Sequence, residues 1–159
     1  MRVNPPRRIA SSDRLTEFDC GKAPLNEWLA RHALKAERER TARTYVACAR
    51  QAPLVVGYYS LAVCSVVRSS IGGGRLARNS PDLAPGVLLA RLAVDLRSQG
   101  LGLGTSLLAD AVNKAEAVSE RAGARALIVE ALDDEAATFY LAKGFIPFPA
   151  DPARLFHRI

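Results

Sequence analysis

Three closely spaced glycines stand where the chain passes from an apolar segment into an amphipathic one. They are Gly100, Gly102 and Gly104, within the stretch RSQGLGLGT over 97–105. Glycine lets the backbone come close to a ligand, and the free amides of a loop and of a helix that begins there attract negative charge. The stretch therefore predicts an anion site suited to a pyrophosphate.

Its spacing separates this loop from two common phosphate-binding loops. A Walker A loop needs Gly-Lys-Ser/Thr, but Gly104 is followed by Thr105 without a lysine, which excludes the P-loop NTPases. A Rossmann GxGxxG that begins at Gly100 needs glycine where Thr105 stands, so that interpretation is weak. The residues leave one further alternative, a turn that joins strand to helix and binds nothing.

The segments on both sides of the glycines are predicted to hold the loop in place. The segment before it, VLLARLAV over 87–94, is apolar almost throughout, which is typical of a central strand covered on both faces. After it, from about Gly102 to Arg121, leucine, alanine and valine repeat at helical spacing. Gly123 ends this helix, and ALIVEA over 126–131 predicts a second buried strand, parallel to the first by the right-handed crossover rule.

The rest of the chain predicts further helices and strands of an α/β protein with a mixed sheet. In chain order these are an amphipathic helix over 24–38, a β-hairpin of strands 44–49 and 54–67, a long loop over 68–86, a helix capped by Asp133 or Asp134 that ends at Lys143 before Gly144, and short terminal strands over 145–148 and 155–159. We expect a single domain over 1–159.

Composition indicates which broad classes of protein are excluded. About half of the 159 residues are apolar, enough for a core without disulfides or metals. No run of eighteen apolar residues and no signal-peptide pattern occurs, so we expect a cytoplasmic protein without membrane contact. The three cysteines, Cys20, Cys48 and Cys64, lack metal-ligand or disulfide spacing, which predicts no metal site.

Basic charge gathers in two parts of the chain. The net charge is +6, from 22 Lys and Arg against 16 Asp and Glu. Residues 1–50 hold eleven bases and six acids, a surplus of five, and residues 68–97 hold five arginines and two aspartates. This pattern fits a polyanionic partner or an ordinary solvated surface equally well. The candidate contacts to a polyanion are Lys35, Arg38, Arg75, Arg78 and Arg91.

The glycine loop also resembles the acetyl-CoA loop of the GNAT acyltransferases, Gln/Arg-x-x-Gly-x-Gly/Ala. Gln99, Gly102 and Gly104 occupy the motif positions, and a shifted frame through Arg97, Gly100 and Gly102 also fits. The resemblance implies the GNAT fold and acetyl-CoA as co-substrate. The loop residues that would hold it are Gln99, Gly100, Leu101, Gly102, Leu103, Gly104 and Thr105.

The resemblance implies roles on both sides of the loop. In the family, the strand before the loop splays and its backbone pairs with the pantetheine arm, which here involves Leu92, Ala93 and Val94; an amide near Val94 would meet the oxyanion. AATFYLAKGF over 136–145 looks like the family's closing helix, so Tyr140 would protonate the departing thiolate, as a phenol of pKa near 10 can. An aromatic core residue is the alternative for Tyr140. Glu135 stands where relatives often have asparagine.

Four pieces narrow the resemblance to the toxins of GNAT toxin–antitoxin modules. They are FDCG over 18–21 with LNEWL over 25–29, VGYYSL over 56–61, LARLAVD over 89–95, and the Tyr140 segment. This implies acetylation of the α-amino group of an aminoacyl-tRNA, a homodimer, and a ribbon-helix-helix type antitoxin. An N-acetyltransferase for a small amine or a protein N-terminus stays open, as does a non-catalytic module that binds CoA or nucleic acid.

Overall fold

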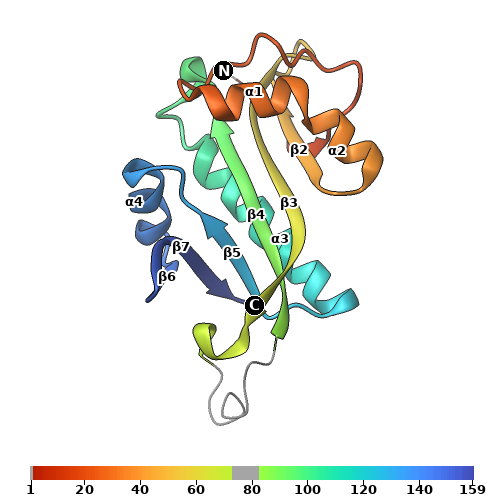
Figure 1. Ribbon diagram of the computed structural model, residues 1–159. Coiled ribbons are helices and arrows are strands. Elements are labelled where there is room, and N and C mark those ends of the chain that lie inside the picture. The colour runs from red at the N-terminus through yellow and green to blue at the C-terminus, as the bar shows by residue number, and fades with distance from the viewer. Residues whose placement is uncertain (1, 73–82) are drawn as a thin grey trace. The chain divides into compact units, whose positions relative to one another are not determined.

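The computed structural model describes residues 2–72 and 83–159 (Figure 1). The strands of the described residues follow the order β1-β2-β3-β4-β5-β7-β6 in a 7-stranded sheet. The described chain forms two compact units, one of residues up to 62 with 90–111, and one of residues 63–72, 83–89 and 112–159. Three elements belong to both units. The expected single domain over 1–159 stays a prediction.

The elements divide between the two units as follows. The first unit holds β1 (Arg7–Arg8), α1 (Ala23–Arg31), α2 (Ala33–Glu39), β2 (Arg43–Cys48) and the 3₁₀ turn Leu96–Ser98. Both units share β3 (Val55–Val67), β4 (Leu83–Val94) and α3 (Leu103–Ala122). The second unit holds the 3₁₀ turn Arg68–Ile71, β5 (Ala126–Glu130), α4 (Asp134–Ala142), β6 (Ile146–Phe148) and β7 (Asp151–Arg158).

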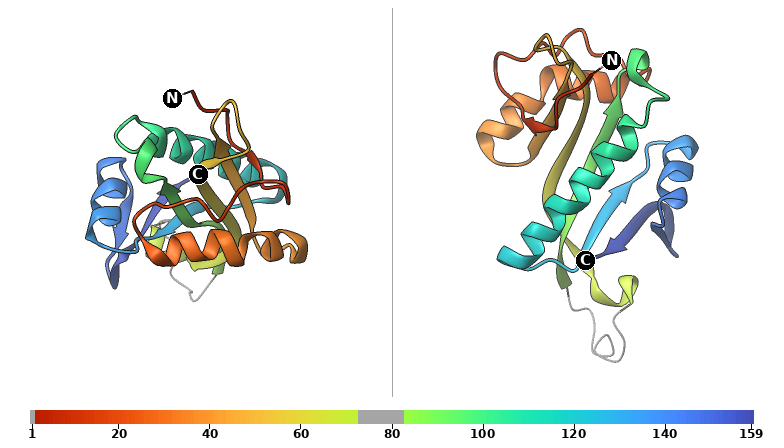
Figure 2. Two further views of the ribbon diagram at one scale, coloured as in Figure 1. Left: turned by 90° about the horizontal axis from the view of Figure 1, so that it is seen from above. Right: turned by 180° about the vertical axis from the view of Figure 1, so that it is seen from behind.

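In the first unit, the predicted hairpin of β2 and β3 is confirmed, and helices cover both of its faces. Tyr58 is fully buried on the α1 face, where its hydroxyl donates a hydrogen bond to the carbonyl of Leu25 at 2.8 Å. Tyr59 lies on the opposite face and donates to the carboxylate of Asp110 in α3. Figure 2 shows α1 and α2 on one side of β2 and β3 and the N-terminal half of α3 on the other.

The single helix predicted over 24–38 is wrong, because the helix is broken at His32. There φ is −122°, which separates α1 from α2, although the His32 amide still donates to Trp28 O at 2.8 Å. Apolar spacing does not mark the break, since the buried residues Leu29 and Ala33 lie four positions apart on either side of it. After the break, α2 lies against β2, where Glu37 accepts a hydrogen bond from the Thr44 amide at 3.2 Å.

The second unit contains the predicted parallel pair. β4 and β5 pair in parallel from Val87↔Leu127 to Leu89↔Val129, and β5 pairs with β7 in antiparallel fashion (Figure 1). The cap of α4 is also confirmed, since the Asp133 side chain accepts a hydrogen bond from the Ala136 amide at 2.9 Å. Gly144, at φ +90°, follows the end of this helix as expected.

Several predicted boundaries are wrong in this unit. β4 begins at Leu83 instead of 87, because Gly86 lies inside the strand: a Cβ there would meet Ile128 Cδ1 at 3.0 Å. β7 begins at Asp151, four residues before the predicted start. Within the predicted loop, Arg68–Ile71 forms a short 3₁₀ turn, which such a loop allows. The rest of the predicted loop, 73–82, lies outside the described residues.

The three cysteines lie at or near the core. Cys20 and Cys48 are buried, Cys64 is half-buried, and all three are free thiols whose pKa is raised by burial. Within 2–72 and 83–159 no cluster of His, Cys, Asp and Glu could hold a metal ion. None of the described helices has both the length and the apolar character needed to cross a membrane.

Candidate functional site

The glycine loop lies in the first unit and joins β4 to α3. Gly100 has φ +79° and Gly102 has φ +82°, a left-handed backbone that glycine adopts without strain, and a Cβ at either position would meet nothing within 4 Å. The first hydrogen bond of α3 runs from the Ser106 amide to Gly102 O at 3.1 Å, and the amides that precede it in the helix have no intrahelical acceptor. The loop therefore has open amides at the positive end of a helix dipole, which fits a pyrophosphate.

Gln99, at the start of the loop, directs its side-chain amide into the protein. Its Nε2 donates to Val94 O at 2.9 Å and to Cys20 O at 3.2 Å. The side chain therefore fixes the start of the loop to the end of β4 and to the N-terminal segment. Arg97, the first residue of the shifted frame, donates from Nε to Asp95 Oδ1 at 2.9 Å.

Asp95 is a residue of the site that the sequence analysis did not single out. Its carboxylate is almost fully buried and accepts hydrogen bonds from the Asp19 amide at 3.0 Å and from the Arg97 amide at 3.0 Å, besides the Arg97 guanidinium. Burial alone would raise the pKa of Asp95, but the hydrogen bonds from Arg97 and Asp19 together hold it below its ordinary value. Asp95 thus remains ionised and fixes the chain just before the glycine loop.

The same network includes residues of the FDCG and LNEWL segments. Asp19 Oδ1 accepts hydrogen bonds from the Gly21 amide and from Asn26 Nδ2, both at 2.9 Å, and Asn26 Oδ1 accepts one from the Cys20 amide at 2.8 Å. The Leu96 amide donates to Asp19 O at 2.8 Å. Asp19 of FDCG and Asn26 of LNEWL therefore support the loop. The signal available in the sequence was the presence of the short polar side chains Asp19 and Asn26 on either side of the turn at Gly21.

The strand before the loop has one buried and two half-buried side chains at its end. Ala93 is buried, whereas Leu92 and Val94 are half-buried. The register of β4 with β5 covers Val87 to Leu89, but β4 continues to Val94. The segment 90–94 therefore lies outside the parallel pairing with β5, and the expected pairing of its backbone with pantetheine stays a prediction.

Tyr140 lies in α4 of the second unit and is 6 % exposed. Its ring centroid is 5.3 Å from that of Phe139 and 5.5 Å from that of Phe145. Burial raises the pKa of Tyr140, so the phenol stays protonated well above neutral pH. Its hydroxyl makes no hydrogen bond with any residue in the described ranges. Glu135 lies in the first turn of this helix, where the helix dipole favours negative charge.

A family model described as an acetyltransferase (GNAT) domain matches residues 40–147, more than half of the chain. The chain belongs to the GNAT acetyltransferase family. The fold class expected from the sequence is thereby confirmed, and the protein is an acetyltransferase.

Similar GNAT proteins have names and solved complexes that specify an activity. The chain is 41% identical to a tRNA-acetylating toxin of Mycobacterium tuberculosis, over 94% of this chain and 89% of the relative. AtaT in complex with acetyl-methionyl-tRNAfMet is 31% identical, with a TM-score of 0.89, over 99% of this chain and 95% of that one. A mutant AtaT bound to the C-terminus of the antitoxin AtaR and to acetyl-CoA is 32% identical, with a TM-score of 0.83, over 98% and 92%.

The basic residues expected to contact the acceptor of this GNAT protein occupy different surroundings. Arg91 Cζ lies 4.1 Å from the centroid of the Trp28 ring, which in turn stacks on Tyr58 at 6.1 Å. Lys35 is exposed on α2 and faces Glu39 at 4.0 Å, whereas Arg38 is exposed and forms no ion pair within the described residues. Arg75 and Arg78 lie outside the described residues.

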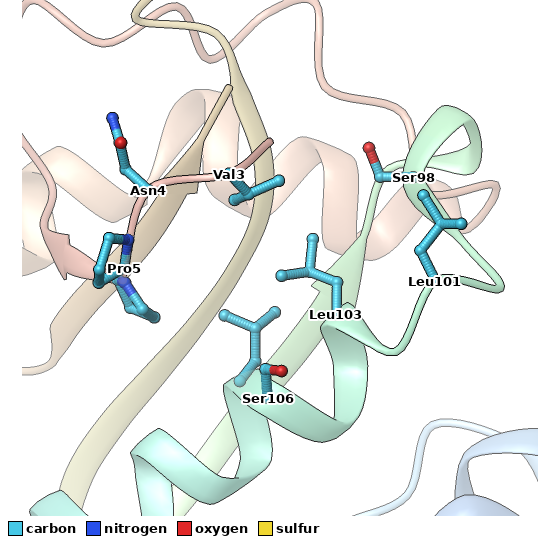
Figure 3. A pocket seen from close by; sticks show the side chains of 9 residues that line it. Val3, Asn4, Pro5, Ser98, Leu101, Leu103 and Ser106 are labelled. Carbon is cyan, nitrogen blue, oxygen red and sulfur yellow. The ribbon is translucent and has the colours of Figure 1, made fainter. Parts of the chain in front are cut away.

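A pocket of about 300 Å³ lies beside the GNAT loop and was not predicted from the sequence. Val3, Asn4 and Pro5 line one side, and Ser98, Leu101, Leu103 and Ser106 line the other, as Figure 3 shows. Leu101 is 68% exposed despite its apolar side chain. Apolar surface therefore adjoins the open amides of the loop.

Proposed function

We propose that this chain is the toxin of a toxin–antitoxin pair and that it acetylates the α-amino group of an aminoacyl-tRNA. The observation that carries the proposal is the loop with its two left-handed glycines at the start of α3. The 41% sequence identity to a tRNA-acetylating toxin, over 94% of this chain, supports the choice of acceptor. Acetyl-CoA is the donor, and its thioester transfers the acetyl group from sulfur to the nitrogen of an amine.

Each proposed role belongs to a described part of the chain. The amides of Gly100 to Thr105 bind the pyrophosphate, and the Gln99 side chain holds this loop in place. The backbone of Leu92, Ala93 and Val94 pairs with the pantetheine arm. As the amine nitrogen bonds to the acetyl carbon and the carbon–sulfur bond breaks, Tyr140 gives its phenol proton to the sulfur, and the proton lost by the nitrogen restores the phenol.

The general-acid role of Tyr140 is tested by Tyr140→Phe. This change removes one hydroxyl and keeps the ring that contacts Phe139 and Phe145. We expect kcat to fall about a hundredfold or more, the usual contribution of general acid catalysis, with the KM for acetyl-CoA nearly unchanged. Stopped-flow detection of released thiol measures this. Full activity in the variant would make Tyr140 a packing residue.

The acceptor is tested by incubating the protein with labelled acetyl-CoA and bulk charged tRNA, followed by mass spectrometry of the aminoacyl ends. The proposal predicts label on the α-amino group of one or more aminoacyl-tRNAs, at a rate that falls steeply with salt. Label on small amines or protein N-termini alone, with little response to salt, would favour the other acceptors. Transfer to no amine would favour a non-catalytic module.

The expected partners are part of the same proposal. A ribbon-helix-helix type antitoxin neutralises the protein, which acts in the cytoplasm as a homodimer. The solved complex of AtaT with the C-terminus of its antitoxin supports this kind of neutralisation. Light scattering of the purified chain should give twice its monomer mass, and a monomer mass at working concentration would exclude the dimer.

A further inference from the structure

Arg40 has a backbone conformation that its residue type disfavours. Its φ of 59° and ψ of 31° place it in the left-handed region, and it is the one non-glycine residue with positive φ among those the structure describes. For a side chain of this size the conformation costs about 1 kcal/mol relative to glycine. Such an outlier calls for a reason beyond local folding.

The end of α2 explains the conformation but not the arginine. The Arg40 amide donates to Glu37 O at 3.4 Å and the Thr41 amide donates to Ala36 O at 3.1 Å, a helix ending in which glycine is the usual residue. The Arg40 side chain is exposed and forms no ion pair or hydrogen bond within 2–72 and 83–159. Nothing in the described structure therefore uses its guanidinium.

The surroundings of Arg40 carry a surplus of positive charge. Five bases, Arg8, Lys35, Arg38, Arg40 and Arg43, form what we term the α2 basic cluster. Its acids are Glu37 and Glu39, so five minus two leaves a surplus of three. Glu37 binds both Arg8 and Arg43, and Glu39 faces Lys35 at 4.0 Å. The acids are thus occupied, and Arg38 and Arg40 add their full charge to the surface.

We propose that the α2 basic cluster, centred on Arg38 and Arg40, binds backbone phosphates of the RNA acceptor. The inference rests on the proposed function and names a surface for its substrate. Guanidinium groups form bidentate hydrogen bonds with phosphate oxygens, and phosphate contacts position an RNA without reading its sequence. The contact with phosphate supplies the reason for arginine at a position suited to glycine.

The chemistry of the cluster favours RNA over an acidic protein. The buried core of a protein interface is usually more apolar than its rim and depleted in charged residues. The large exposed apolar residues of the described chain are elsewhere, namely Val63, Val67, Leu83, Leu96, Leu101, Leu132, Leu141 and Ile146. The residues from 35 to 43 add none to the surface, so the cluster offers charge with no apolar centre.

The test uses Arg40→Gly and Arg40→Asn, because both residues accept a left-handed backbone and keep the end of α2 intact. We expect both variants to raise the KM for aminoacyl-tRNA roughly three- to tenfold and to lower the salt slope of tRNA binding by about 0.7 to 0.9. The KM for acetyl-CoA should be unchanged in both variants. The thermal midpoint should be unchanged in Arg40→Asn and unchanged or higher in Arg40→Gly. Arg38→Gln should add a similar effect.

The matched control is Arg31→Ala, which removes an exposed arginine of α1 that pairs with Glu27 at 3.3 Å. It should leave tRNA affinity and salt slope at wild-type values. Filter binding of uncharged tRNA gives the deciding readout even if the wild type acetylates no tRNA, an outcome that would refute the proposed function alone. An unchanged slope and affinity in Arg40→Gly with Arg38→Gln would overturn the inference.

Discussion

At the scale of single residues, much of the site consists of side chains that bind the protein instead of a ligand. Gln99 stands in the motif of the loop, yet its amide group holds two carbonyl oxygens of the chain. Asp95 and Asn26 similarly bind backbone amides of the segments that meet at the loop. Because these residues hold the segments on either side of the loop, changing them should act on the proposed cofactor site through the position of its amides.

Asp95→Asn tests this positioning role and has a defined pH dependence. The pKa of Asp95 is lowered in the folded protein, so its ionised form adds stability above its unfolded pKa of about 4, and this stability is lost as pH falls through the lower folded pKa. The variant should be about 1–2 kcal/mol less stable at pH 7, because it loses the buried carboxylate that accepts hydrogen bonds from the exposed Arg97 guanidinium. Urea denaturation of the wild type and the variant from pH 7 to pH 3 measures the loss of stability and its pH dependence.

The wild-type and Asp95→Asn curves should converge as the pH is lowered. Asp13 also has a lowered pKa, through its hydrogen bonds to Arg7 and the Ala10 amide despite its burial, and it lowers the stability of both proteins in acid. The difference between the two curves therefore isolates Asp95. Two parallel curves would contradict the ionised state assigned to this residue.

At the scale of elements, the hairpin of β2 and β3 contains a pair of buried hydroxyls that oppose each other. Thr44 pairs with Ser60 across the strands, and both side chains are fully buried. Neither hydroxyl has a hydrogen-bond partner within the described residues. A buried hydroxyl without a partner costs about 1–3 kcal/mol, so the core of the hairpin is less stable than its packing allows.

Thr44→Val should leave stability unchanged or raise it by about 1 kcal/mol, because valine keeps the branched shape and removes the unpaired oxygen. The matched control is Ser119→Ala, which deletes a hydroxyl that donates to Ala124 O at 2.7 Å and should destabilise. Thermal unfolding compares the two variants. A loss of more than 1 kcal/mol in Thr44→Val would mean that this hydroxyl has a partner in solution.

Sequence patterns predicted those elements whose signal is local. The hairpin, α3, β5 and the Asp133 cap of α4 follow from periodicity and turn chemistry, and the glycine loop follows from its composition. The break at His32 was missed because apolar spacing continues across it. Gly86 was misread as a turn residue because its reason is a tertiary one, the close approach of Ile128.

The site shows the same division between local and long-range signals. The loop and its helix are adjacent in sequence, so the pattern was sufficient to find them. Asp95 and Asp19 are 76 residues apart, and only the fold shows that one binds the amide of the other. The left-handed backbone conformation of Arg40 could not be predicted either, because no sequence pattern marks an arginine that adopts it.

At the scale of the whole molecule, basic side chains outnumber acidic ones by 22 to 16. Among the six acids in residues 1–50, Asp13, Glu17, Glu27, Glu37 and Glu39 face basic side chains. Asp19 instead accepts hydrogen bonds from neutral groups. The surplus bases of this region therefore remain on the surface, as a polyanionic acceptor requires. The proposed donor site does not depend on these bases, because it consists of the uncharged amides of the glycine loop.

The most direct test of the account is calorimetric titration of the folded protein with acetyl-CoA and with acetyl-pantetheine, which lacks the pyrophosphate and the 3′-phosphoadenosine attached to it. If the loop amides hold that pyrophosphate, acetyl-CoA should bind at least about tenfold more tightly, since one charge-assisted hydrogen bond is worth about 1.5 kcal/mol or more. Gly102→Ala, which puts a Cβ on a left-handed residue of the loop, should weaken acetyl-CoA alone. Equal binding of the two compounds, or no binding of acetyl-CoA, would contradict the account.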